Sequence, residues 1–128
     1  MIQKEQLIAI LNSIEGTDFK NVQSIDLLID FGFKLQQWLA FSSYQQALCR
    51  ETLHNRRRQA MVNLIASLKA NNASLAPSLQ KEYVNDLCAE DNGVYELACR
   101  CNSCCVHALD FLRSCISALK IEYENTKR

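Results

Sequence analysis

The chain has 128 residues, no net formal charge at neutral pH and 48% hydrophobic residues, and it fits one domain of common size. A single Pro and three Gly favour long helices over many short strands and turns. No apolar run approaches the roughly 18–20 residues of a membrane span, and the N-terminus lacks a signal-peptide pattern. We therefore expect a soluble cytoplasmic protein without a membrane partner.

Residues 1–16 predict an N-terminal helix, because apolar residues recur there at helical spacing. These residues are Ile2, Leu7, Ile10, Leu11 and Ile14. Gly16 stands just past the last of them, where a glycine often ends a helix. A polar connector over residues 17–23 leads to the next element.

Residues 24–70 predict a long helical segment. Ser24 is a good N-cap, and Asp26 lies in the first turn, near the positive end of the helix dipole. Gly32 and the Ser42–Ser43 pair are points where the helix could kink, so the sequence leaves open one continuous helix or two in line. A helix this long extends beyond the core of so small a domain, which favours an elongated shape or partner chains.

Two further helices are predicted, over residues 77–90 and 94–124. Pro77, with Ser74 or Ser78, marks the start of the third helix, and Asp91-Asn92-Gly93 is a strong turn signal after it. The last helix carries a seven-residue apolar repeat, typical of a coiled coil or helical bundle. The repeat consists of Val94, Leu97, Cys101, Cys104, Ala108, Phe111, Cys115 and Leu119. Together with Leu112 it predicts an interface with another copy or a partner chain.

The predicted fold class is therefore all-α. We expect a single domain over residues 1–128, an elongated helical bundle with one long helix that assembles into oligomers.

Seven cysteines are present, and four of them lie between Cys99 and Cys105. Cys101-x-x-Cys104 followed by His107 superficially resembles zinc ligation, but zinc knuckles need a turn and this stretch lies inside a periodic helix. Free cysteine behaves as a small buried hydrophobe, so core packing is the preferred interpretation. We expect no metal, no cofactor and no catalysis, because no glycine-rich turn or paired-carboxylate pattern accompanies these residues.

Charge is segregated along the chain despite the neutral total. Residues 50–70 hold five basic side chains and one acid, a local charge of +4. The candidate nucleic-acid-binding residues in this stretch are Arg50, His54, Arg56, Arg57, Arg58 and Lys69. Residues 78–98 hold five acids and one lysine, a local charge of −4. Residues 50, 54, 57 and 58, three arginines and a histidine, share one helix face. They either clamp phosphates, form a solvated face, or pair with the acids of the third helix.

Five short motifs follow one another between Lys34 and Lys120. They are Gln36-Gln37-Trp38-Leu39, the basic residues Arg50 and Arg56–Arg58, the stretch Tyr83–Asp91, Leu109-Asp110-Phe111, and Ala118-Leu119-Lys120. With these motifs the chain resembles the UvsY family of phage recombination mediators. The resemblance implies a non-enzymatic oligomer that binds single-stranded DNA and helps a RecA-like recombinase displace single-strand-binding protein.

By position, the family's DNA-binding basic residues fall on Arg50, Arg56, Arg57 and Arg58. Two departures from the family are the neutral net charge and the cysteines in the last helix, where the family carries other apolar or small residues. A second hypothesis is a helical protein-binding module that does not bind DNA. Such a module is an inhibitor of a host defence or CRISPR effector, or a small subunit of a larger complex.

Overall fold

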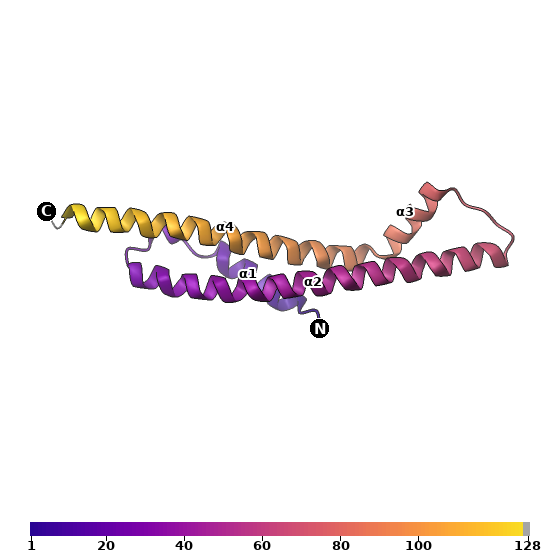
Figure 1. The fold of residues 1–128 in the computed structure, drawn as a ribbon, viewed down its shortest axis with the longest axis horizontal. Coiled ribbons are helices and arrows are strands. Elements are labelled where there is room, and N and C mark those ends of the chain that lie inside the picture. The colour runs from indigo at the N-terminus through magenta and orange to yellow at the C-terminus, as the bar shows by residue number, and fades with distance from the viewer. Residues whose placement is uncertain (127–128) are drawn as a thin grey trace.

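The computed structural model describes residues 1–126, which form an all-α fold (Figure 1). Its elements are α1 (Lys4–Glu15), a 3-10 turn η1 (Phe19–Asn21), α2 (Ile25–Ala70), α3 (Pro77–Leu87) and α4 (Ala89–Thr126). The all-α prediction is confirmed. Within the described residues, no helix is long and apolar enough to cross a membrane.

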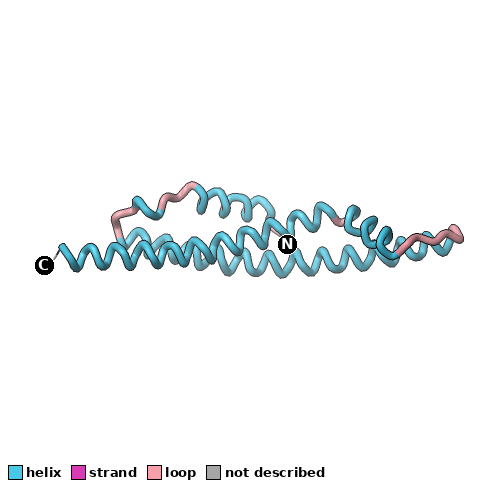
Figure 2. The backbone as a smooth tube through the Cα atoms, turned by 90° about the horizontal axis from the view of Figure 1, so that it is seen from above, coloured by secondary structure: helices cyan, strands magenta, loops and turns pink. Residues whose placement is uncertain are grey.

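The molecule is built around two long helices that run antiparallel, side by side (Figures 1 and 2). At a rise of 1.5 Å per residue, the 46 residues of α2 span about 69 Å and the 38 residues of α4 about 57 Å. Ser24 caps α2, because its hydroxyl accepts a hydrogen bond from the Leu27 amide at 3.3 Å. The helix continues through Gly32 and Ser42, so the single long helix is the correct alternative.

The core lies between α1, α2 and α4 and consists of two adjoining groups of buried side chains. The first comprises Leu7, Ile10, Leu11, Cys49, Ala98, Cys101 and Cys105. The second comprises Phe19, Leu28, Leu35, Ala108, Leu109 and Leu112. Helix α1 and η1 therefore pack against one half of the α2–α4 pair. We call this three-helix part of the molecule the body. The aromatic rings of Phe19 and Phe31 meet edge to face there, with centroids 4.9 Å apart.

A buried amide fixes the start of the chain against this body. Gln45 on α2 accepts a hydrogen bond from the Gln3 amide at 2.7 Å and donates one to the Met1 carbonyl at 3.2 Å. Gln3 is the N-cap residue of α1 and makes no side-chain cap of its own. The Gln45 side chain thus satisfies backbone groups that a helix N-terminus leaves unpaired.

Beyond the body, residues 54–88 form a part that we call the distal arm. It contains the second half of α2, the connection over residues 71–76, and α3 lying obliquely beside α2 (Figure 1). Helix α2 ends with Asn72 in the left-handed region, at a φ of 49°, and the Ala73 amide donates to the Leu68 carbonyl at 2.9 Å. This geometry is a common helix ending, which asparagine tolerates well.

The expected turn at Asp91-Asn92-Gly93 is wrong, because these residues lie inside α4. The chain breaks at Cys88 instead, so the third helix ends at Leu87 rather than residue 90, and the last helix begins at Ala89 rather than residue 94. Two acids, Glu90 and Asp91, lie in the first turn of α4, where the helix dipole favours negative charge. Their contribution outweighs the turn tendency of Asn-Gly.

Candidate nucleic-acid interface

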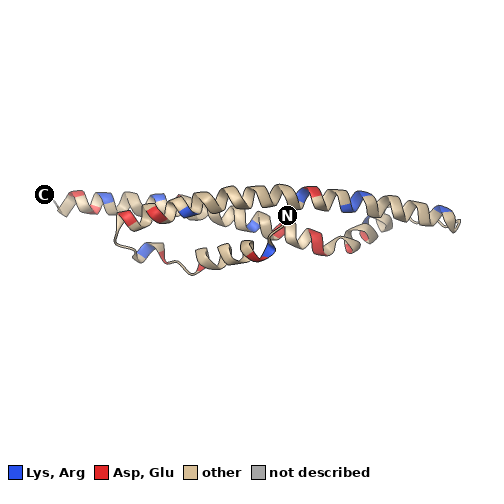
Figure 3. Ribbon diagram, turned by 90° about the horizontal axis from the view of Figure 1, so that it is seen from below, with Lys and Arg blue, Asp and Glu red and all other residues tan. Residues whose placement is uncertain are grey.

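Three of the candidate nucleic-acid-binding residues lie together on the exposed side of α2. Arg50, His54 and Arg58 line a shallow hollow of about 400 Å³, together with Ala47, Glu51 and Asn55. Their spacing of four residues places them on successive turns of one face. Figure 3 shows basic residues concentrated in this middle stretch of α2, with acidic residues on α3 and at the start of α4.

Arg57 lies at the edge of this face and is half-buried. Its Nε is enclosed and has no hydrogen-bond partner among residues 1–126. An enclosed donor without an acceptor costs stability. We call Arg50, His54, Arg57 and Arg58 the cation face.

Arg56 does not belong to the cation face. Its Nε pairs with the carboxylate of Asp91 on α4 at 3.4 Å, which ties the start of the distal arm to α4. Both partners are partly exposed, so the pair contributes little to stability. Lys69 lies eleven residues beyond Arg58, about 16 Å further along α2, so it is separate from the cation face. It lies in the last turn of α2, where a positive charge complements the helix dipole.

The acids of α3 and α4 leave the cation face unpaired. Within residues 1–126, the ion pairs are Arg56–Asp91, Arg100–Glu15 and Arg113–Asp110. The interpretation that the arginines pair with the acidic third helix therefore holds for no residue of the cation face. Arg56 alone makes such a pair, and its partner lies on α4.

The apolar repeat of the last helix faces the chain's own core. Cys101, Ala108 and Leu112 are buried against α1 and α2. Five further members are half-buried and pack around the same core, namely Val94, Leu97, Cys104, Cys115 and Leu119. Phe111 is 48% exposed. The expected interface with another chain is thus corrected for most of this repeat, because the α2–α4 pairing within one chain already covers it.

The cysteines are free thiols, and five of them pack in or against the core, as predicted. They are Cys49, Cys101, Cys104, Cys105 and Cys115, whereas Cys88 lines the groove between α2 and α3. A hydrogen bond to Cys105, together with burial, raises the pKa of Cys101. Burial and the neighbouring Cys99 thiol raise the pKa of Cys49. Thiols with raised pKa values carry little thiolate and react slowly. Among the described residues, no three His, Cys, Asp or Glu side chains converge to hold a metal ion.

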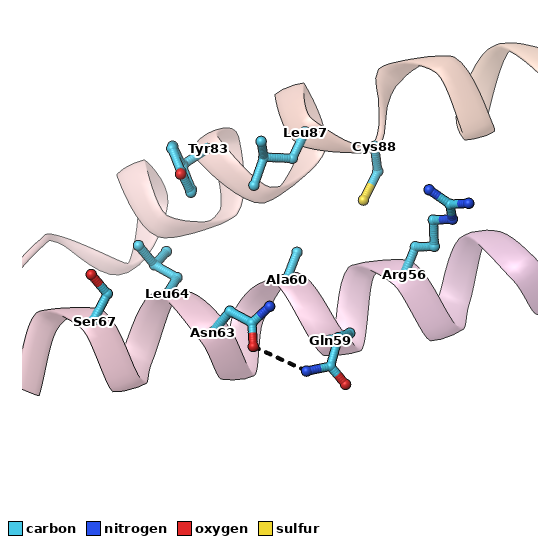
Figure 4. Close-up of a pocket in the computed structure, with 9 residues that line it drawn as sticks. All are labelled: Arg56, Gln59, Ala60, Asn63, Leu64, Ser67, Tyr83, Leu87 and Cys88. Atoms are coloured by element: carbon cyan, nitrogen blue, oxygen red, sulfur yellow. Dashed lines mark hydrogen bonds between the residues drawn. The ribbon is translucent and has the colours of Figure 1, made fainter.

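A groove that the sequence analysis missed runs between the distal part of α2 and α3 (Figure 4). Its volume is about 640 Å³. Leu87 and Tyr83 of α3 lie across from Leu64 and Ala60 of α2, and polar side chains line the α2 wall. Gln59 and Asn63 on this wall are joined by a hydrogen bond of 3.0 Å. The spacing of Tyr83 and Leu87, one turn apart in the third helix, was the available signal.

The cation face offers positive charge and hydrogen-bond donors, and the hollow that it lines contains no serine or cysteine nucleophile. Guanidinium groups match the geometry of phosphate oxygens, so the arrangement is suited to binding an extended polyanion. Comparisons of the chain with models of protein families, with curated proteins and with solved structures found no match. The functional proposal therefore depends on the geometry of α2.

Proposed function

We propose that the chain is a non-enzymatic protein that binds the phosphate backbone of single-stranded DNA through the cation face. The observation that supports this most directly is the segregation of charge in a neutral chain. Three arginines and a histidine gather on one side of α2 without an ion-pair partner among residues 1–126.

Arg50, His54 and Arg58 lie on successive turns of α2 and would contact successive phosphates, because each turn advances about 5.4 Å along the helix. Such contacts neutralise the DNA backbone and displace its counterions, so affinity falls as salt rises. Contacts to phosphate carry no sequence information. Binding should accordingly be strongly salt-dependent and indifferent to base sequence.

We further propose a mediator role, in line with the resemblance to the UvsY family. In this role the protein would hold single-stranded DNA while a RecA-like recombinase replaces single-strand-binding protein. Sequence-independent binding to the DNA backbone suits this role, because the recombinase must load at any sequence. The recombinase and single-strand-binding protein are thus the partners that we expect beside DNA.

The test is a titration of fluorescent single-stranded DNA with the full chain, read by anisotropy across a salt series. The variant Arg50→Glu/Arg57→Glu should bind at least tenfold more weakly and show a shallower salt dependence. The matched control, Lys34→Glu/Lys120→Glu, changes the net charge equally at exposed sites away from the cation face. Absence of binding at low salt, or an equal loss in both variants, would overturn the proposal.

The runner-up is a helical protein-binding module, such as a defence inhibitor or a subunit of a larger complex. The specific observation in its favour is the groove between α2 and α3, whose α3 wall carries the partly exposed side chains of Tyr83 and Leu87. A chain that shows no salt-dependent DNA binding but retains a protein partner only while Tyr83 and Leu87 are intact would favour this module.

A further inference from the structure

A second seven-residue repeat runs along the outer side of α2, turned away from α4. Its members alternate in steps of four and three residues over four heptads. They are Ala40, Tyr44, Ala47, Glu51, His54, Arg58, Met61, Ile65 and Leu68. At 100° per residue this row lies opposite the core-facing residues Leu35, Cys49 and Leu53. Six of the nine members are apolar, and Glu51, His54 and Arg58 separate them at the centre. Apolar residues at this period are typical of a helix that packs lengthwise against another helix.

Within residues 1–126, the outer row lies outside the core. None of its members belongs to either core group of residues 1–126. Four of its apolar members are exposed, with Tyr44 at 62% and Ile65 at 41%, whereas Met61 and Leu68 are half-buried; Val62 beside the row is 56% exposed. Helices α1, α3 and α4 contact other sides of α2, through Trp38, Leu64 and Leu35 among others. A helical face with this much apolar surface is typical of an interaction site.

We propose that a second copy of the chain packs antiparallel along this outer row, with the two-fold axis passing close to His54. In this orientation Glu51 of each copy approaches His54 and Arg58 of the other. A parallel pairing would instead place Glu51 on Glu51 and Arg58 on Arg58. Opposite charges at facing positions set the orientation of paired helices, and like charges exclude the alternative.

Side-chain size fits the same antiparallel register. The small side chains of Ala40 and Ala47 lie on one side of the axis, and the bulkier Met61 and Ile65 lie on the other. The two-fold axis places Ala47 of one copy against Met61 of the other and Ala40 against Leu68, and it places the large Tyr44 against Ile65. The pairing extends over residues 40–68, about 42 Å of helix. The distal part of α2, which has little cover in one chain, would then be supported by the middle of α2 from the second copy.

The pairing takes His54 and Arg58 of each cation face into the contact between copies and leaves Arg50 and Arg57 for DNA, a consequence that rests on the proposed function. Arg50 and Arg57 lie on the same flank of the outer row, one on each side of the axis. A two-fold axis perpendicular to both helices keeps this flank on one side of the dimer. Four arginines from two copies then gather within about two helical turns. The four arginines on this flank would bind one DNA strand more tightly than the two arginines of one copy.

Sedimentation velocity of the full chain without DNA tests the pairing at micromolar concentration. We expect a particle of twice the 14.6 kDa of one chain. Tyr44→Glu/Ile65→Glu should weaken self-association at least tenfold while the helix content by circular dichroism is unchanged, because both side chains are exposed. The control Leu27→Glu alters an equally exposed residue outside residues 40–68 and should leave the dimer intact. A native chain that stays monomeric, or equal behaviour of both variants, would overturn the proposal.

A charge exchange tests the orientation. Glu51→Arg alone should dissociate the dimer, because it places like charges opposite each other. Glu51→Arg/Arg58→Glu should restore it. These positions are seven residues apart, about 10.5 Å along one helix, so the restoration requires a contact between copies. Failure of the double variant to recover would rule out the antiparallel pairing.

The DNA-binding variant Arg50→Glu/Arg57→Glu should remain dimeric while it loses DNA. A chain that dimerises without binding DNA would refute only the proposed function, and a monomer that binds DNA would refute only the pairing.

Discussion

The body and the distal arm of this molecule differ in what holds their helices in place. In the body, α1, α2 and α4 share a continuous core, and most of the fully buried side chains lie there. In the distal arm, Val84 and Cys88 are the buried hydrophobic residues, and α3 leaves an open groove against α2. One helix thus passes from a three-helix environment into one with partial cover, so stability should decline along α2.

The largest expected effect is a contrast between two leucines of α2. Leu35→Ala removes a fully buried side chain from the body and should lower the free energy of unfolding by about 2–5 kcal/mol. Leu64→Ala removes a half-buried side chain that lines the groove and should cost about 1 kcal/mol or less. Urea denaturation measures both values. Similar losses would show that the arm is packed as firmly as the body.

An intermediate effect is expected at Gln45, which holds the chain start against the body. Gln45→Ala leaves the Gln3 amide and the Met1 carbonyl without their partner and should destabilise the fold by about 1–3 kcal/mol. Hydrogen exchange should show faster opening of α1 than of α4. The exposed Gln37→Ala serves as the control. Unchanged exchange in α1 would mean that its apolar face alone fixes this helix.

The smallest expected effect compares two glycines within helices. A Cβ at Gly93 would meet no atom within 4 Å, so Gly93→Ala should stabilise α4 by up to about 1 kcal/mol through helix propensity. A Cβ at Gly32 would lie 3.1 Å from Leu112 Cδ2, so Gly32→Ala should gain less, because the close approach of α2 and α4 offsets the propensity. Thermal unfolding measures both. Destabilisation by Gly93→Ala would indicate that Asn92-Gly93 prefers a turn.

Local sequence signals predicted the elements well, and long-range contacts explain where they failed. Ser24 and the apolar period fixed the start and course of α2, because capping and amphipathicity act within a few residues. The start of α4 was missed because the turn tendency of Asn92-Gly93 competes with acids at a helix N-terminus and with the Arg56–Asp91 pair. The pairing of α2 with α4 joins residues that are far apart in the sequence, so a short stretch of sequence reveals neither the pairing nor its geometry.

In the candidate site, too, local sequence signals predicted some features and long-range contacts determined the others. Helical periodicity placed positions 50, 54, 57 and 58 on one face, and the structure brings Arg50, His54 and Arg58 together there. Periodicity could not reveal that Arg56 turns to α4, or that the apolar repeat of α4 is occupied by its own chain. The outer row of α2 could be recognised only after the position of α4 had shown which side of α2 is covered.

The helical state of Asn92-Gly93 also bears on the chemical ageing of the protein. Asparagine followed by glycine deamidates readily when the glycine amide can attack the side-chain carbonyl and close a succinimide ring. In α4 the backbone is helical at both residues, and the Asn92 amide group donates a hydrogen bond to Glu96 Oε1 at 3.2 Å. Ring closure must await local unfolding at the start of α4. The deamidation rate at Asn92 therefore reports how often that end of the helix unfolds.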